Sequence, residues 1–332
     1  MPKASIVVPA YNVAATLPAT LQSLRAQTFA DYEIVLVDDG STDETLEIAQ
    51  SFDCDRLRIV EQANRGLAGA RNSGIAAARG ELVGFCDSDD LWHPTKLERH
   101  VRHLDARPEV GVSYSASAMI DEAGLPLGLS QTPRLTNIDA AHIFRRNPVG
   151  NGSAPVIRRA ALDAIAWRPA GEFIRDWWFD ESFRQSEDIE CWLRMALTTD
   201  WAFEGIRGDL TLYRINSGGL SAGVEAQFRA WERLVEKLTP LAPGFFERHT
   251  PAARAYQLRY LCRRAISDGD AAAAATLARR SFQSSRRPLW EEPAKSATTF
   301  AAALALGALG ADRFQSLRNA VSGRTATSDQ TL

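Results

Sequence analysis

Short apolar runs alternate with helical patterns over the first hundred residues. Runs rich in β-branched and aliphatic residues predict buried strands at 5–9, 32–37, 57–61 and 82–86. Between them, apolar residues spaced three and four apart predict helices through Leu17 and Leu24, up to Ser51, and over 67–78. Strands joined by single helices predict a parallel sheet with right-handed crossovers, whose ligands bind beyond the carboxyl ends of the strands.

The pattern is less regular between residues 106 and 222. A strand is expected at 110–120 with a hairpin turn at 121–124, and 128–149 shows no clear pattern. The other expected elements are a strand at 153–157, a short helix at 159–165, an aromatic-rich loop at 167–183, a helix at 189–197 with Ser186 as its N-cap, strands at 201–206 and 209–214, and a flexible loop at 215–220.

From Val224 onward only helical periodicity remains. Phe228, Trp231 and Leu238 fall on one helical face. Further helices are expected at 256–266, 271–282 and 300–317, before a polar, frayed end at 323–332. The sequence therefore predicts an α/β core followed by a helical C-terminal region.

Composition narrows the function classes. The 332 residues carry a formal net charge of −3, which argues against non-specific nucleic-acid binding. The four scattered cysteines are expected to be reduced packing residues of a cytoplasmic protein. The start of the chain lacks the pattern of a secretory signal, and the longest apolar stretch, 300–311, is shorter than the ~20 residues of a membrane helix. Peripheral membrane contact stays open.

Three carboxylates follow the fourth expected strand. If that strand persists to Asp87, then Asp87 and Asp89 point to the same side, because strand side chains alternate. Two such acids suit Mg²⁺ or Mn²⁺, with phosphate oxygens in the open positions. The alternative is helix capping, with Asp89 or Asp90 as the N-cap of a helix that runs from Lys96 to Leu104.

A second acidic pair, Asp38 and Asp39, ends the second expected strand. Turn chemistry explains Gly40, and Ser41 with Glu44 fits a capping box for the next helix. Two consecutive acids are explained less well by a turn. A carboxylate here could accept a hydrogen bond from a nucleobase N–H.

Three further charged residues are candidates. Arg71 lies on a small, apolar helix, where it either pairs with a carboxylate or faces a nucleotide with its fork of donors. Glu187 and Asp188 lie in the first turn of a helix, where acids favour the helix dipole. A carboxylate at that position that faced the metal would suit general-base catalysis.

Several other residues are expected to serve packing or to be solvated. Trp177 and Trp178 could stack on a sugar, but buried aromatic residues are commoner. His100 and His103 lie on a polar helix and are expected to be solvated. The remaining packing residues are Trp192, Leu193 and Met195 in the core, and Gly66, Gly69 and Gly74 between helices.

No glycine-rich dinucleotide motif follows the first strand, and no GxxxxGK[ST] motif is present. Instead, five motifs occur in order: Ile6-Val7-Val8-Pro9-Ala10-Tyr11-Asn12, Val37-Asp38-Asp39-Gly40-Ser41-Thr42-Asp43, Asn64-Arg65-Gly66-Leu67 with Ala70-Arg71-Asn72 and Gly74, Asp87-Ser88-Asp89-Asp90, and Glu187-Asp188 with Trp192-Leu193-Arg194. Together they resemble family 2 glycosyltransferases of the GT-A fold, a bacterial polysaccharide type. The resemblance covers about residues 4–220.

The resemblance implies an inverting transfer from a nucleotide-sugar, usually a UDP-sugar, with a divalent Mg²⁺ or Mn²⁺ ion. Asp188 is then the catalytic base with Glu187 beside it, and Asp89 and Asp87 are the metal ligands. The implied nucleotide-sugar contacts are Pro9, Tyr11, Asn12, Asp38, Asp39, Arg71, Asp87 and Ser88. Many relatives carry a His near the end of the core, where this chain has Asn216.

The resulting expectation is a GT-A domain over 1–222 and a helical region over 223–332. The first domain divides into a Rossmann-like nucleotide-binding half, 1–105, and an acceptor and catalytic half, 106–222. The acceptor would be a glycan or a lipid-linked glycan, and the protein would act in the cytoplasm or at the inner face of the cytoplasmic membrane. A sugar nucleotidyltransferase and a non-catalytic nucleotide-sugar-binding or scaffold protein are the alternatives.

Overall fold

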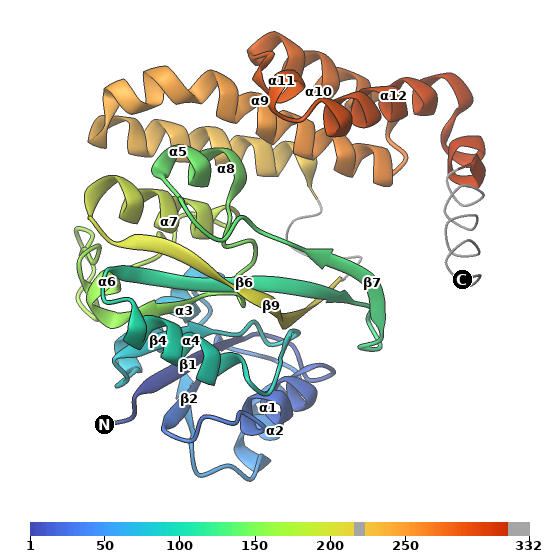
Figure 1. Cartoon of the computed structure of the whole chain (residues 1–332). Helices are drawn as coiled ribbons and strands as arrows, with labels where there is room; N and C mark the ends of the chain where they lie inside the picture. The colour runs from blue at the N-terminus through green and yellow to red at the C-terminus, as the bar shows by residue number, and fades with distance from the viewer. Residues whose placement is uncertain (216–222, 318–332) are drawn as a thin grey trace. The chain divides into compact units, whose positions relative to one another are not determined.

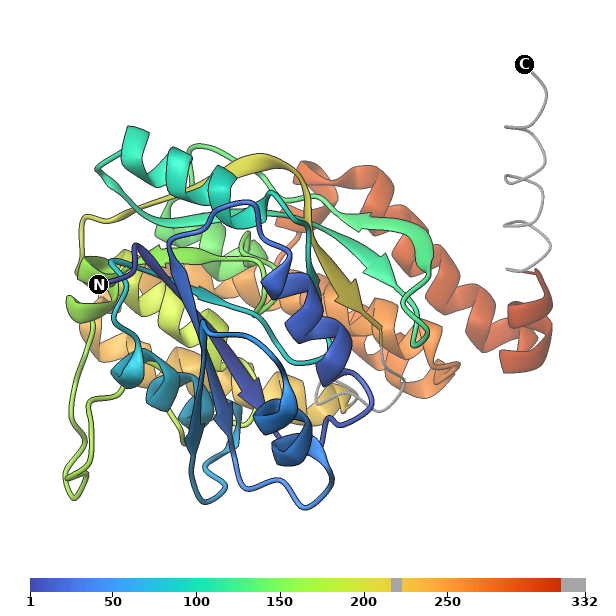
Figure 2. The same cartoon turned by 90° about the horizontal axis from the view of Figure 1, so that it is seen from below.

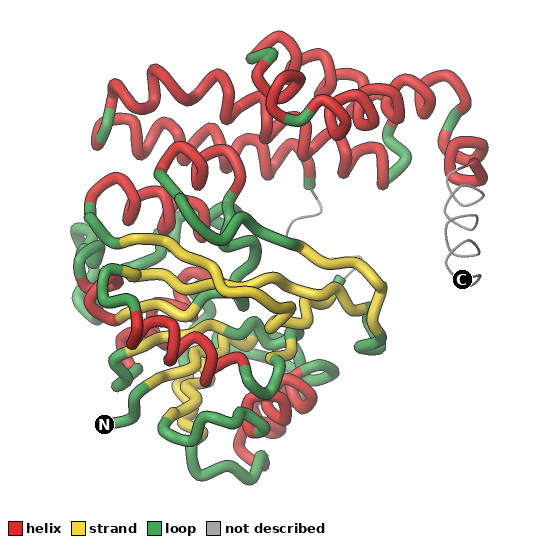
Figure 3. Tube along the Cα trace, viewed as in Figure 1, coloured by secondary structure: helices red, strands yellow, loops and turns green. Residues whose placement is uncertain are grey.

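The computed structural model describes residues 1–215 and 223–317. The chain divides into two compact units, residues 1–222 and 223–332. Figure 1 follows the chain from its N-terminus to its C-terminus, and Figure 3 shows that strands are confined to the first unit and that helices build the second. The expected loop at 215–220, Asn216 and the polar end at 323–332 lie outside the described residues, except for Ile215.

The first unit is organised around a mixed sheet. Its strands are β1 (Ala4–Ala10), β2 (Tyr32–Asp38), β3 (Leu57–Glu61), β4 (Leu82–Phe85), β5 (Leu91–Trp92), β6 (Val110–Ile120), β7 (Pro126–Gln131), β8 (Val156–Arg158) and β9 (Ala202–Arg214). In the described residues the order is β3-β2-β1-β4-β8-β6-β9-β5, with β7 paired to β6. The first four strands are parallel, as expected, and β8 runs antiparallel to both β4 and β6.

Helices cover both faces of this sheet (Figures 1 and 2). They are α1 (Leu17–Arg25), α2 (Thr45–Ser51), α3 (Gly66–Ala77), α4 (Lys96–Ala106), α5 (Ala140–Arg146), α6 (Arg159–Asp163) and α7 (Glu187–Thr198). The larger core lies on one face, where Leu21 of α1 and Leu97 of α4 pack with Ile6 and Ile34. On the other face Ala70 of α3 packs against β2. Alternate residues of each strand therefore serve different cores, which explains the uninterrupted apolar runs.

The segment 128–149 is more regular than its sequence indicates. It contains most of the edge strand β7 and the helix α5, whose N-cap Asp139 accepts a hydrogen bond from the His142 amide. The Asp139 cap was the available signal. Two expected strands at 201–206 and 209–214 are instead one strand, β9, which passes through Gly208 at φ +106°. Strand β8 begins at Val156 rather than at residue 153.

Two capping predictions are wrong. Helix α2 begins at Thr45, and the Ser41 hydroxyl accepts a hydrogen bond from the Asn12 amide instead of forming a capping box with Glu44. Helix α4 has Thr95 as its N-cap, with β5 between it and the acidic turn, so neither Asp89 nor Asp90 caps it. The acids of that turn thus have other partners.

Histidines and glycines also differ from the expectation. His100 is fully buried 2.7 Å from the Ser113 hydroxyl, and burial lowers its pKa well below the usual value. His103 contacts the same hydroxyl and is not solvated. Gly74 lies against strand β1 and not against another helix. A Cβ at this position would come within 2.2 Å of Val7 Cγ1. That glycine lets α3 approach the sheet closely.

The second unit is helical throughout its described part. It comprises α8 (Val224–Leu238), a 3₁₀ turn (Thr239–Leu241), α9 (Pro243–Ser267), α10 (Ala271–Ser284), α11 (Arg287–Glu291) and α12 (Pro293–Leu309), after which residues 311–317 are again helical. Apolar faces of α8, α9 and α10 form its core around Trp231, Leu261 and Leu277. Buried Arg259 of α9 donates to Ser296 of α12 at 2.5 Å. No helix in the described residues is both long and apolar enough to cross a membrane.

Candidate active site

The buried guanidinium of Arg71 joins three separate parts of the first unit. Arg71 lies on α3 and is only 2% exposed. It donates to Asp87 Oδ1 at 2.8 Å, just beyond β4, and to Glu187 Oε1 at 2.9 Å, at the start of α7. The guanidinium is also 5.6 Å from the Phe179 ring centroid. Arg71 therefore pairs with two carboxylates, and its role as a nucleotide contact stays a prediction.

A glycine makes this approach possible. A Cβ on Gly152 would come within 2.1 Å of an Arg71 nitrogen and 2.7 Å of Asp87 Oδ2. The segment around residue 152 therefore closes over the ion pair only because no side chain intervenes. Neither periodicity nor a motif indicates Gly152 in the sequence, because the close approach involves residues far apart in the chain.

The acidic turn after β4 divides its carboxylates by burial. Asp90 is fully buried and accepts from the Ser153 hydroxyl at 2.6 Å and from the Arg214 amide at 2.9 Å. The same serine oxygen accepts from the Asp87 amide at 2.8 Å. Burial raises the pKa of Asp90 well above its usual value. Asp90 thus fastens the turn to the core, and Asp87 and Asp89 retain partly exposed side chains.

The donor set of this turn fits a hard divalent cation. Asp87 and Asp89 offer carboxylate oxygens, the ligand type that Mg²⁺ and Mn²⁺ prefer. Within residues 1–215 and 223–317, no cluster of three or more His, Cys, Asp or Glu residues is arranged to hold a metal. A cation held by two carboxylates would complete its coordination with ligand oxygens and water. Asn216 lies outside the described residues.

The pair after β2 has two distinct environments. Asp39 accepts from the side-chain amide of Gln62 at 2.6 Å and from the amides of Arg65 and Gly66 at 2.8 Å each. Asp38 accepts from the Ser41 amide at 3.3 Å, and its Oδ1 is buried with no hydrogen-bond partner in the part of the chain described. Asp39 therefore accepts hydrogen bonds from residues 62–66, whereas Asp38 Oδ1 has accepting capacity left over. The nucleotide-contact role of both acids stays a prediction.

The other predicted nucleotide contacts lie at the same edge of the sheet. Pro9 is in the last part of β1, and Tyr11 beyond it is 49% exposed. Asn12, at φ +52°, accepts from the Thr42 amide at 2.8 Å and so links the first strand's turn to the second's. Ser88 is buried, and its carbonyl accepts from the Thr20 hydroxyl at 3.0 Å. Asn12 and Ser88 thus hold turns together.

The two acids of α7 also differ. Glu187 is buried against Arg71, and burial raises its pKa to about 6 although Arg71 opposes the shift. Asp188 is partly exposed, accepts from Asn147 Nδ2 at 3.1 Å, and has its pKa raised by burial. The N-cap Ser186 is left-handed, at φ +65°, and its hydroxyl forms no capping bond. Asp188 is therefore the more exposed acid of this pair, and Asn147 is a hydrogen-bond partner that the sequence did not indicate.

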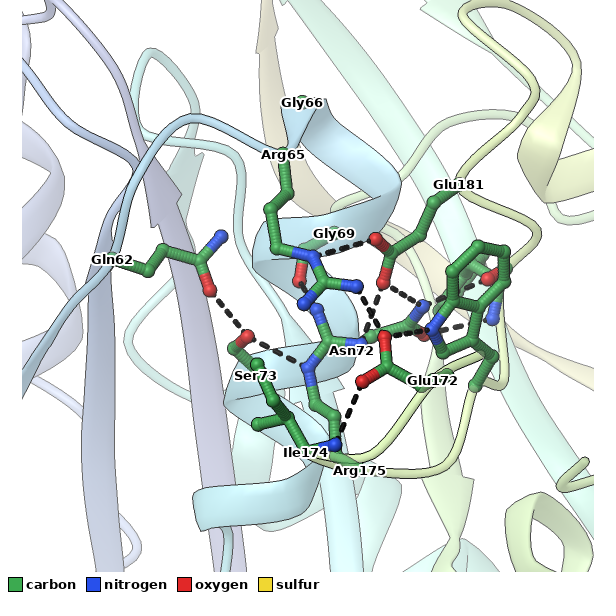
Figure 4. Close-up of polar contacts among 12 residues, drawn as sticks. Gln62, Arg65, Gly66, Gly69, Asn72, Ser73, Glu172, Ile174, Arg175 and Glu181 are labelled. Carbon is green, nitrogen blue, oxygen red and sulfur yellow. Dashed lines mark hydrogen bonds and ion pairs between the residues drawn. The ribbon is translucent and has the colours of Figure 1, made fainter. Parts of the chain in front are cut away.

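A polar network fastens the aromatic-rich loop to α3 (Figure 4). Arg175 donates to Glu181 Oε1 at 2.6 Å, to Ser73 Oγ at 2.9 Å and to the Gly69 carbonyl at 2.9 Å. Arg65 donates to Glu181 at 2.8 Å and also pairs with Glu172. The loop and the helix that carries Arg71 are thus held as one piece.

The aromatic residues of this loop serve packing. Trp177 donates to Glu172 at 3.0 Å and packs edge-on with Trp167, and Trp178 is buried. Phe179 packs edge-on against Trp192, which is buried with Leu193 and Met195 as expected. Neither tryptophan is an open platform for a sugar.

Comparisons with known proteins show which proteins this chain is similar to. A model described as Glycosyl transferase family 2 matches residues 5–166. The chain is 44% identical over 186 residues to an uncharacterized glycosyltransferase of Nostoc sp., covering 50% of this chain and 56% of that protein. It is 32% identical over 197 residues to the succinoglycan biosynthesis protein ExoO of Rhizobium meliloti, covering 57% and 54%. The chain thus spans about half the length of these curated relatives.

Solved structures share the fold. S. aureus TarS superposes with a TM-score of 0.58 at 18% identity, covering 90% of this chain and 54% of TarS. The mannosyltransferase PcManGT from Pyrobaculum calidifontis, in complex with GDP-Man and Mn²⁺, gives 0.52 at 21% identity, covering 92% and 87%. The expected GT-A-like fold with a helical C-terminal region is therefore confirmed. Residues 5–166, which contain the motifs at 6–12, 37–43, 64–74 and 87–90, are therefore similar to glycosyl transferase family 2.

Proposed function

We propose that the protein is an inverting glycosyltransferase, which moves a sugar from a nucleotide-sugar to a hydroxyl group of a glycan or lipid-linked acceptor. The observation that carries this proposal is the Arg71 bridge, which holds the acidic turn after β4 beside the acidic start of α7. The two predicted parts of the site, about one hundred residues apart in sequence, are thereby brought together. The transfer reaction needs the group that binds the donor and the group that takes the acceptor's proton to lie close together.

Relatives and neighbours with named ligands support the donor class. The E. coli relative WfaP, 37% identical over 112 residues that cover 33% of this chain and 44% of WfaP, is named a UDP-Glc-dependent glucosyltransferase acting on a diphosphoundecaprenol-linked sugar. TarS 1–349 was solved with UDP-GlcNAc, at a TM-score of 0.54 and 19% identity, covering 92% of this chain and 81% of that one. A UDP-sugar is therefore the proposed donor for this chain, and Asp38 Oδ1 is the proposed acceptor for a base N–H.

The proposed general base is Asp188. Glu187 is occupied by Arg71, whereas Asp188 is partly exposed and is oriented by Asn147 and by the Ile189 amide. Asp188 would take the proton of the attacking hydroxyl, and inversion follows when that hydroxyl attacks the face opposite the leaving diphosphate. Arg71 would contribute by holding Asp87 at a fixed distance from the base.

Asp89 and Asp87 would hold a divalent cation, which stabilises the negative charge that develops on the leaving diphosphate. The turn that presents these carboxylates is kept rigid by Asp90, through Ser153 and Arg214. The two carboxylates would therefore already be positioned in the folded protein, before the donor binds.

The donor site is tested by thermal stability with Mn²⁺ and UDP, GDP, CDP or dTDP, each repeated with EDTA. A nucleotide at 100 times its dissociation constant should stabilise the fold by about 2.7 kcal/mol. The proposal expects the largest shift with UDP and its loss with EDTA. A folded sample that responds to no nucleotide would favour a scaffold role instead.

The base assignment is tested with Asp188→Asn. We expect turnover to fall by roughly 10²–10⁴-fold while the UDP-dependent thermal shift is kept, because only proton transfer is removed. Asp163→Asn, at an exposed acid of α6, is the matched control and should keep full turnover. If Asp188→Asn also lost the nucleotide shift, the residue would belong to the donor site and not to proton transfer.

A further inference from the structure

Helix α12 exposes an apolar face. Residues 296–311 contain no charged side chain. One side of the helix is buried in the second unit through Ser296, Thr299, Ala303 and Leu306. The opposite side is exposed, and it carries Ala294, Ala297, Ala301, Leu304 and Ala308.

This face is unusual for a helix in water. A helix that is apolar on all sides is ordinarily buried in a core or in lipid. In α12, however, Leu304 is 76% exposed, and the helix lacks the length and hydropathy to cross a bilayer. A helix of this kind can lie along an interface, with its outer side against the acyl chains.

Cationic and aromatic residues lie immediately before α12. Trp290 of α11 is 81% exposed, and Phe282 at the end of α10 is 46% exposed with the Arg286 guanidinium 5.2 Å from its ring centroid. Arg287 follows Arg286 and pairs with Glu291 at 2.5 Å, and Lys295 in the first turn of α12 lies 3.5 Å from Glu292. Both pairs are at the surface, where the Arg287 and Lys295 side chains remain 48% and 66% exposed. Tryptophan and basic residues beside an apolar helix are the composition of an interfacial membrane anchor.

The distribution of charge indicates the partner. Residues 223–332 carry 16 Lys and Arg against 10 Asp and Glu, whereas residues 1–222 carry 22 against 31. The net negative charge of the whole chain therefore hides a positive helical region. A second copy of this chain packed on the same face would bring like charges together, because a two-fold interface uses the same patch twice. An anionic surface would meet no such repulsion.

We propose that α11 and α12, with Trp290 and Leu304 as apolar contacts and Arg286, Arg287 and Lys295 as cationic contacts, dock the protein on an anionic lipid bilayer. The outer face of α12 enters the acyl boundary, and the basic residues contact the headgroups. This surface is distinct from the donor site, so the proposal does not depend on which sugar is transferred.

The test is co-sedimentation of the full chain with vesicles of phosphatidylcholine alone, or of phosphatidylcholine mixed with phosphatidylglycerol. Binding should require the anionic lipid and should weaken as salt is added. Arg286→Gln combined with Arg287→Gln should weaken binding about 30-fold, from about fivefold for each cation near the surface. Arg102→Gln, at a 74% exposed arginine of α4, is the matched control and should have no effect.

Leu304→Glu tests the apolar face. It should abolish vesicle binding, whereas Leu125→Glu, at a 63% exposed leucine before β7, should not. Both sites are exposed, so the melting temperature should stay unchanged, and light scattering reports the molar mass of each variant. Failure to bind anionic vesicles, equal binding of the Leu304→Glu variant, or a dimer that Leu304→Glu dissociates would each overturn the proposal.

Discussion

Replacing Arg71 with lysine removes the fork that joins Asp87 to Glu187 and keeps the positive charge. The two guanidinium nitrogens lie 2.8 Å and 2.9 Å from their carboxylates. A lysine ammonium is a point donor on a differently shaped stem, so it can satisfy one carboxylate at good geometry but not both. The substitution therefore tests bidentate geometry rather than charge.

The expected cost follows from burial. Arg71 and Glu187 have side chains 3% and 10% exposed, and Asp87 is 23% exposed. Losing one hydrogen bond to a charged group costs about 1.5–3 kcal/mol. Arg71→Met, which leaves Glu187 buried and without its cation, should cost about 3–5 kcal/mol. The free energy of unfolding of Arg71→Lys should therefore lie between those of the wild type and Arg71→Met.

The assay is urea unfolding of the three proteins, together with the UDP-dependent thermal shift. Arg71→Lys should lower the free energy of unfolding by about 1.5–3 kcal/mol and weaken the nucleotide shift, because Asp87 loses its fixed position. Arg102→Lys, in an exposed pair with Glu98, should change stability by less than about 0.5 kcal/mol. An Arg71→Lys protein as stable as the wild type, with an undiminished shift, would refute the bridging role.

Two further predictions concern packing and pH. Gly74→Ala should lower the free energy of unfolding, measured in urea, by about 1–3 kcal/mol, because its Cβ would come within 2.2 Å of Val7 Cγ1. The control is Gly244→Ala, whose added Cβ has no atom within 4 Å and which should not lower the free energy of unfolding. Burial raises the pKa of Glu187 from 4.5 to about 6, so its contribution to stability is present below pH 4.5 and is lost as pH rises through about 6. Melting temperatures over this interval should fall for the wild type relative to Glu187→Gln, and parallel curves would contradict the assignment.

The N-terminal half could be predicted because its signals are local. The β-branched run at 32–37 and the leucine spacing at 17–24 depend only on which face each residue presents, and both elements are observed. The strand in segment 128–149 was not predicted, because β7 is an edge strand whose alternating leucines, Leu127 and Leu129, are exposed and pack into no core. The burial of His100 could not be predicted either. Its helix, α4, is polar in sequence, and His100 is buried because α4 packs on β6.

The candidate site divides in the same way. The acids after β2 and β4 and at the start of α7 are evident in the sequence, because parallel strands place their carboxyl ends at one edge of the sheet. The partners of these acids are not evident: Arg71 joining Asp87 to Glu187, Gly152 leaving room for that bridge, and Asn147 holding Asp188. Sequence determined which residues could do chemistry. Tertiary structure decided which of them are paired and buried and which stay accessible, because desolvation and contact depend on segments that only folding brings together.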